Sequence, residues 1–279
     1  MKGIIKAVIA GSVIIAIGIA ILVIALALNG WTISQPKFEM KRYEATEENT
    51  SLKVEFGAGS LKTVYYDGEK IAVEYPEARG YVGEITEKDG KLSFKTRSKI
   101  LFINIGRWNV PDTVIYLPKN VTYDIDFKLG AGSVELVSGN YGEVKIEVGA
   151  GMFTAAGLYC DNIDAKVSAG MLEITSAECN VFDAKVSAGK LNIASAFCNT
   201  FNGKVSAGKL SASSLSAEKI SANVSAGSLE LRVSGALTEY SVSTSVSAGS
   251  CNLSDRTGTT DKKIDAKVSA GSLNITFTD

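Results

Sequence analysis

The tetrapeptide V-S-A-G occurs six times in this chain of 279 residues. Together with the related G-A-G words that end at Gly132 and Gly151, these units place their last glycines 19, 19, 19, 19, 19, 22 and 22 residues apart. A fixed period of this length is typical of proteins whose repeats stack on one another and share one core. The six tetrapeptides begin at Val167, Val186, Val205, Val224, Val246 and Val268.

Within each unit, apolar and polar residues alternate with a period of two, the pattern of a β-strand with one buried face. Three short apolar segments recur in each 19-residue unit, which fits three walls of one coil. We therefore predict an all-β fold, a single-stranded, β-helix-like solenoid with about eight coils over residues 128–279. The glycine at each corner is expected to supply a positive φ. An array of antiparallel hairpins is the alternative.

Residues outside the regular period also alternate like strands. Residues 51–127 contain runs such as Leu52–Phe56 and Thr113–Leu117, and we predict irregular amino-terminal coils of the same solenoid. The two steps of 22 residues are expected to place extra residues in loops near 237–239 and 257–259.

The amino-terminal end carries a long apolar segment. Residues 7–28 contain no charged side chain, and a helix of this length would be roughly 33 Å long, enough to cross a bilayer core of about 30 Å. Because Lys2 and Lys6 precede it, the amino end is expected to stay in the cytoplasm. We predict an uncleaved anchor over residues 1–28 and a single-pass protein of the cell membrane, with its carboxy-terminal domain outside the cytoplasm.

Two other interpretations of this end are open. Ala25-Leu26-Ala27 has the A-x-A form of a signal-peptidase site, which would make the segment a cleaved signal peptide. The cations at Lys37, Lys41 and Arg42 would favour the inverted topology. Residues 29–50, with mixed charges and Pro36, are predicted to be a juxtamembrane linker.

The composition excludes several kinds of chemistry. The chain has no histidine, which removes Ser-His-Asp and Cys-His nucleophile pairs and histidine-ligated zinc. Its 29 Lys and Arg residues are balanced by 30 Asp and Glu residues, so nothing favours nucleic acid as a partner. We predict that the protein is not an enzyme, has no cofactor, and has no catalytic, cofactor-binding or metal-binding residue.

The cysteines fall into the repeat. Cys160, Cys179 and Cys198 are 19 residues apart and would form one column, whereas Cys251 falls in the column of Leu191. We interpret the thiols as small core residues. A disulfide, or a metal or redox role, is the alternative, although in-register neighbours have poor disulfide geometry.

A column of cations is predicted on the outer surface. Lys166, Lys185 and Lys204 recur beside Asp164 and Asp183. We interpret this column as a solvated face in which opposite charges neutralise one another. Alternatively it is a binding stripe for an anionic wall polymer, or the two carboxylates act on a polysaccharide.

Several words in the sequence point to a known family. These are the G-A-G at 57–59, VIYLPKN at 114–120, KLGAGSVEL at 128–136 and the recurring AKVSAGxLxI units. With them, residues 50–279 resemble the bacterial putative-adhesin family of β-strand-repeat proteins, a domain of unknown function. The resemblance implies a membrane-anchored envelope protein, and it brings no catalytic or ligand-binding residue.

From these observations we predict a non-catalytic structural or interaction module, adhesin-like or accessory to envelope stress. Its expected partners are the membrane, through one spanning helix, and an envelope polymer or protein on the solenoid face. Alternatively it is a scaffold that associates end to end through an open carboxy-terminal strand at residues 275–279. A wall-polysaccharide-binding or -processing protein is the more remote alternative.

Overall fold

The computed structural model describes residues 37–98 and 110–278, together with Val23. The anchor predicted over residues 1–28 therefore lies outside the described residues, apart from Val23. None of the helices in the described part is long and apolar enough to span a membrane. The described part is all-β, as predicted, apart from the single turn of 3-10 helix η1 (Leu237–Glu239). The strands are β1 (Glu39–Glu44), β2 (Ser51–Phe56), β3 (Ser60–Tyr66), β4 (Ala72–Glu77), β5 (Tyr81–Lys88), β6 (Lys91–Ser98), β7 (Thr113–Pro118), β8 (Tyr123–Leu129), β9 (Ser133–Leu136), β10 (Gly139–Val148), β11 (Met152–Tyr159), β12 (Asn162–Val167), β13 (Met171–Val186), β14 (Lys190–Val205), β15 (Lys209–Val224), β16 (Ser228–Ser234), β17 (Ser241–Val246), β18 (Ser250–Cys251), β19 (Lys263–Val268) and β20 (Ser272–Thr278).

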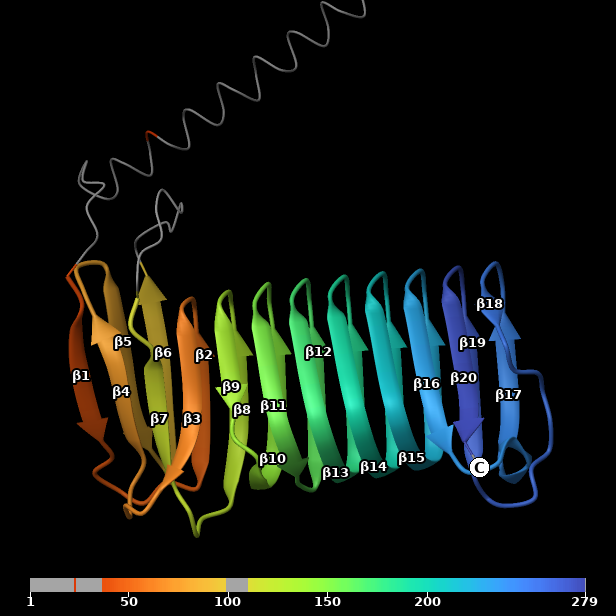
Figure 1. The fold of residues 1–279 in the computed structure, drawn as a ribbon, viewed down its shortest axis with the longest axis horizontal. Coiled ribbons are helices and arrows are strands. Elements are labelled where there is room, and N and C mark those ends of the chain that lie inside the picture. Colours follow the sequence, from red (N-terminus) through yellow and green to blue (C-terminus); the bar gives the residue numbers. More distant parts are fainter. Residues whose placement is uncertain (1–22, 24–36, 99–109, 279) are drawn as a thin grey trace, which may run out of the picture.

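The coils stack in parallel and in register. Leu172 of β13 lies opposite Leu191 of β14, and Phe182 lies opposite Phe201, so equivalent residues of adjacent repeats are direct neighbours. This parallel pairing excludes the hairpin array. Figure 1 shows the stack from the side.

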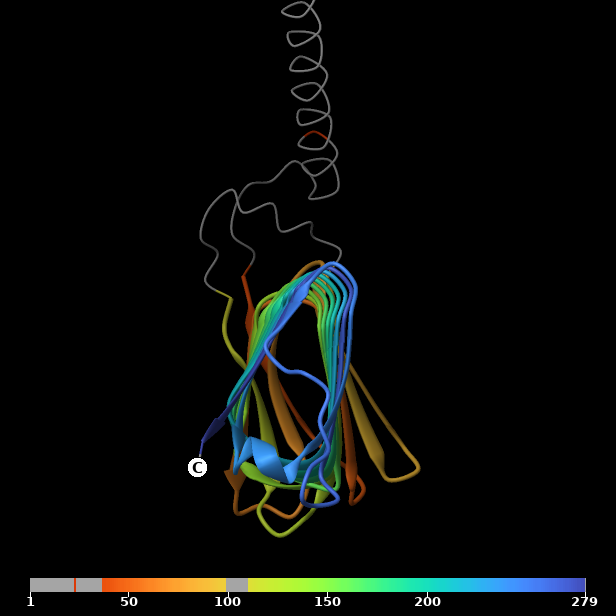
Figure 2. The same ribbon diagram turned by 90° about the vertical axis from the view of Figure 1, so that its right-hand side faces the viewer.

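Viewed along the stack, each coil has two long walls and a shorter side (Figure 2). The walls meet at the Ala-Gly corners, and we call this row of corners the glycine edge. The opposite, shorter side is formed where β11, β13, β14 and β15 bend, and we call it the base. The base comprises residues 157–161, 176–180, 195–199 and 214–218.

The predicted apolar columns form one continuous core. Ile163, Phe182, Phe201 and Ile220 are at most 2% exposed, and the Phe182 and Phe201 rings pack edge to face with centroids 5.6 Å apart. Burial of a side chain of this size stabilises the fold by about 1.5–3 kcal/mol. Because every coil adds to the same core, the stack is stabilised mainly by contacts between neighbouring coils.

The corner glycines meet a different requirement from the one predicted. Among the described corner glycines, Gly59 and Gly132 have positive φ, at 112° and 98°, but those from Gly151 to Gly271 do not. There, a Cβ atom added at Gly170 would lie 2.2 Å from the carbonyl oxygen of Gly151, and one at Gly189 would lie 2.3 Å from that of Gly170. The expectation of positive φ thus holds at Gly132 and is wrong for the corners from Gly151 to Gly271, where glycine allows neighbouring corners to approach one another.

The order of the last coils differs from their order in the sequence. Strand β19 pairs with both β15 and β17, and β20 pairs with both β16 and β18. The final coil is therefore inserted between its two predecessors. The two longer connections make this possible: one contains η1 and the other residues 252–262, so the extra residues lie where they were predicted.

The predicted open strand at residues 275–279 is not the end of the stack. Beyond the short β18, the Asn252 side chain pairs with β20: its Nδ2 donates to the Ile275 carbonyl at 2.8 Å, and its Oδ1 accepts from the Ile275 amide at 2.9 Å. On the outermost strand β17, Val242 exchanges backbone hydrogen bonds of 2.9 and 3.0 Å with Arg256. Exposed strand edges promote pairing between chains, and these contacts cover part of that edge.

The amino-terminal end of the stack is closed by antiparallel strands. Strands β6 and β7 pair in parallel outside β2 and β3, and β5 then pairs with β6, β4 with β7, and β1 with β4. Strand β1 lies within residues 29–50, so the prediction of a linker there is wrong for residues 39–44, which pair with β4. Its first residue, Glu39, lies opposite Glu77, which places the start of β1 at the glycine edge (Figure 1).

One carboxylate holds the chain after β1 in place. Glu87 of β5 accepts hydrogen bonds from the Tyr43 hydroxyl, the Thr46 amide at 2.8 Å, the Glu47 amide at 3.1 Å and the Asn49 side chain at 3.1 Å. Burial alone would raise the pKa of Glu87, but these hydrogen bonds outweigh burial and lower the pKa to about 2.

Substitution of a corner glycine should destabilise the stack. Because a new Cβ would contact the Gly170 carbonyl, we expect Gly189→Ala to lower the free energy of unfolding by about 1–3 kcal/mol, as measured by urea denaturation. Ala188→Ser, at an exposed position beside it, is the control and should leave the free energy within about 0.5 kcal/mol of its original value. Equal stability of the two variants would contradict the close-approach argument.

Removal of the Glu87 charge should weaken the amino-terminal end in a pH-dependent way. The folded-state pKa is lowered from 4.5, so the stabilisation is present above about pH 4.5 and is lost as the pH falls towards 2. We expect Glu87→Gln to cost about 1–2 kcal/mol at pH 7 and much less at pH 2.5, measured by urea denaturation. Thr86→Ser, on the exposed face of the same strand, changes no charge and should show no such difference between the two pH values.

Candidate binding surface

Two of the three lysines in the predicted column, Lys166 and Lys185, pair with carboxylates, whereas the exposed Lys204 forms no ion pair with a described residue. Lys166 Nζ lies 2.8 Å from the Asp164 carboxylate and 3.6 Å from Glu147, and Lys185 Nζ lies 3.8 Å from Asp164. Asp183 accepts a hydrogen bond of 2.8 Å from Asn202. Each carboxylate of the predicted pair is thus engaged by a neighbour on the same wall. The arrangement agrees with the solvated-face interpretation.

The cysteine column lies at the base. Cys179 pairs with Cys198 on the next coil, and their exposed fractions are 8% and 3%. Cys160 is half-buried, Cys251 lies opposite Leu273 as predicted, and all four thiols are free. The hydrogen bond to Cys198 and burial raise the pKa of the Cys179 thiol, and burial raises that of Cys160 to about 12. These thiols are therefore protonated at neutral pH, which suits core residues better than nucleophiles. Within the described residues, no group of three or more Cys, Asp or Glu side chains could hold a metal ion.

A second row of residues at the base faces outward. Tyr159, Glu178 and Phe197 are in-register neighbours on β11, β13 and β14. Tyr159 is 41% exposed and Phe197 is 59% exposed, whereas the other described aromatic side chains are buried or half-buried. The two rings belong to coils two steps apart, a distance of about 10 Å.

These rings flank a groove on the outer surface of the base, which we call the aromatic groove. It has a volume of about 580 Å³ and continues over the row of residues two positions further along each coil, which are Asp161, Asn180 and Asn199. Asn199 donates to the Asn180 side chain at 3.2 Å, so the two amides are aligned along the stack. The lining includes Asp161 and Glu178 but neither Lys nor Arg.

This groove was not predicted from the sequence. Tyr159 and Phe197 occupy the polar position between two apolar columns, where solvated side chains are expected. One feature of the sequence could have predicted it. Tyr159 and Phe197 are 38 residues apart, which is twice the period, so they share the column that Glu178 and Ser216 occupy in other coils.

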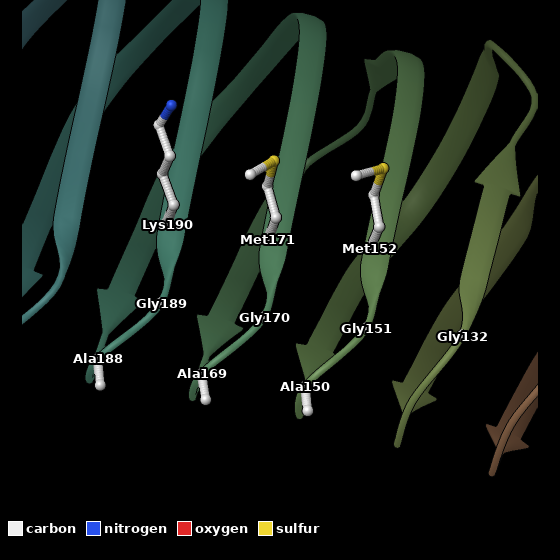
Figure 3. Close-up of a pocket in the computed structure, with 10 residues that line it drawn as sticks. All are labelled: Gly132, Ala150, Gly151, Met152, Ala169, Gly170, Met171, Ala188, Gly189 and Lys190. Carbon is white, nitrogen blue, oxygen red and sulfur yellow. The ribbon is translucent and has the colours of Figure 1, made fainter. Parts of the chain in front are cut away.

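A shallower hollow of about 560 Å³ follows the glycine edge. In Figure 3, Met152, Met171 and Lys190 point in the same direction from three adjacent coils. The hollow is lined by the same backbone and Ala-Gly units in each coil. It therefore resembles a repeating surface more than a site for one ligand.

Comparisons with known proteins agree with this architecture. A family model described as Toastrack DUF4097 matches residues 49–278. A putative adhesin from Bacteroides fragilis NCTC 9343 has a similar structure, with a TM-score of 0.55, 15% identity, and coverage of 86% of this chain and 97% of that protein. A putative adhesin from Parabacteroides merdae ATCC 43184 gives a TM-score of 0.53 at 8% identity, with coverage of 87% and 97%. At these identities the likeness shows the fold alone. No curated protein has significant sequence similarity to this chain.

The thiols at the base should react only slowly with thiol reagents in the folded protein. Because Cys179 and Cys198 are buried and burial raises the pKa of the half-buried Cys160, we expect little reaction with an aromatic disulfide reagent at pH 7.5, and rapid reaction of all four cysteines in 6 M guanidinium. A Cys251→Ser variant removes the half-buried thiol outside this column. Fast labelling of this variant without denaturant would contradict the core-filling interpretation.

Proposed function

Since the chain belongs to the Toastrack DUF4097 family, whose model covers residues 49–278, we propose that it is a membrane-anchored, non-catalytic interaction module that acts outside the cytoplasm. The adhesin names of its structural neighbours support this class of role without identifying a ligand. The proposed anchor is the apolar segment 7–28, with the amino end in the cytoplasm.

One structural observation carries this proposal. Glu39, where the described chain begins its first strand, lies at the glycine edge, whereas the aromatic groove lies at the base. A chain held in a membrane by residues 7–28 would therefore be attached along one edge and would present the groove at the opposite edge. Such an arrangement suits a module that displays a rigid surface to an external partner.

The end-to-end scaffold has less support. Its proposed contact was an open carboxy-terminal strand, but β20 lies between β16 and β18 and is covered further by Asn252. The outermost strand β17 is bridged by Arg256, and the Thr244 amide donates to the Asp255 carboxylate at 2.6 Å. These contacts occupy backbone groups that a second copy would need for pairing.

Thiol labelling in intact cells tests the location. The four native cysteines are replaced by Ala or Ser, and one Cys is placed at Lys185, which is exposed on β13. We expect a membrane-impermeant maleimide to label this variant without lysis. A matched Lys2→Cys variant in the same background should be labelled only after lysis. The reverse pattern would place the solenoid in the cytoplasm and would overturn the proposal.

A further inference from the structure

The aromatic groove has the chemistry of a site for an extended carbohydrate chain. We propose that it binds an uncharged or amine-bearing β-linked glycan, which lies across the strands and parallel to the axis of the stack. This inference names the partner of the module proposed above and rests on that role.

The spacing of the two rings carries the first step. Tyr159 and Phe197 project from the same outward column, two coils apart, so the two residues are about 10 Å apart along the groove. This is close to the length of a disaccharide unit in an extended β-linked glycan. The apolar face of a pyranose ring packs well on an aromatic ring, and two such platforms would hold alternate sugars of one chain.

The polar row beside the rings carries the second step. Asp161, Asn180 and Asn199 line the groove on adjacent coils, one strand spacing apart. Planar amides can donate to and accept from neighbouring hydroxyl groups, and carboxylates can accept from pairs of them. The bond from Asn199 to Asn180 aligns both amides and leaves the Asn180 NH₂ group and the Asn199 carbonyl oxygen without a partner among the described residues.

Charge decides between kinds of polymer. Asp161 and Glu178 line the groove, neither forms an ion pair with a described cation, and no Lys or Arg lines it. An acidic polymer would therefore meet uncompensated negative charge, whereas hydroxyl or ammonium groups would find acceptors.

The backbone argues against a peptide strand as the occupant. The base is crossed by β11, β13 and β14, whose neighbours on either side pair with them in parallel. An extended peptide binds most readily by adding to a free strand edge, and the groove runs across the strands, where no such edge is offered. Recognition here must come from side chains, which matches the way that glycans are bound.

Affinity electrophoresis of the full-length chain in mild detergent tests the inference. The gels contain hydroxyethyl cellulose, glycol chitosan or polygalacturonate, which are neutral, amine-bearing and acidic probes. We expect retardation by one or both of the first two and none by polygalacturonate. Phe197→Ala and Tyr159→Ala should each weaken binding about tenfold, and Phe197→Tyr should retain it.

Met152→Ala is the matched control, because Met152 has a comparable exposure of 47% but lies at the glycine edge. It should bind as the original chain does. The inference is overturned if neither neutral nor amine-bearing polymer retards the chain, or if the Tyr159 and Phe197 variants bind unchanged. A further gel contains polylysine, a basic peptide probe. The inference is also overturned if polylysine alone retards the chain and if this retardation depends on Tyr159 and Phe197. If the chain binds glycan but the thiol labelling places the solenoid in the cytoplasm, the proposed location is wrong and the proposed ligand class still holds.

Discussion

The close approach of successive backbones at the glycine edge underlies the rest of this structure. At each regular corner, the carbonyl oxygen of one glycine occupies the space that a side chain on the next would need. With that space free, the hydrogen bonds of the two walls continue through the turn, as from the Ala188 amide to the Ser168 carbonyl at 2.7 Å. The walls therefore stay in register, the apolar columns align, and any outward residue recurs at a fixed interval. The aromatic groove is one product of this regularity.

The two ends show how a regular stack is stopped. At one end the chain changes from parallel to antiparallel pairing through β4, β5 and β1, and at the other a side-chain amide and a short loop satisfy part of the last strands. Strands β1, β4 and β5 and the loop that contains Arg256 lie outside the regular period. The cost of leaving backbone groups unpaired explains why the irregular part of the sequence is concentrated there.

The repeat allowed the core to be predicted residue by residue, because a period of 19 with a strand alternation of two leaves one arrangement for the buried columns. The column containing Phe182 and the pairing of Cys251 with leucine both followed from it. The order of the last coils did not, since Val224 can pair equally well with Val246 or Val268 when every coil carries the same side chain there. Strand β1 escaped prediction because its residues are mostly exposed and carry no alternation. The groove was not predicted because Tyr159 and Phe197 are far apart in the sequence. They form one surface only when the coils that carry them are stacked.

The insertion of the last coil between its predecessors has a consequence for the synthesis of the protein. As the chain leaves the ribosome, each regular coil can settle on the one made just before it, so assembly can follow translation. This order of assembly stops after β16, because β17 and β18 pair with β19 and β20, which are made after them. The coil formed by β17 and β18 therefore stays unpaired until β19 and β20 emerge from the ribosome. These two strands then insert between β15 and β16 on one side and β17 and β18 on the other. The domain is therefore completed only once β19 and β20 have been made and have paired on both sides.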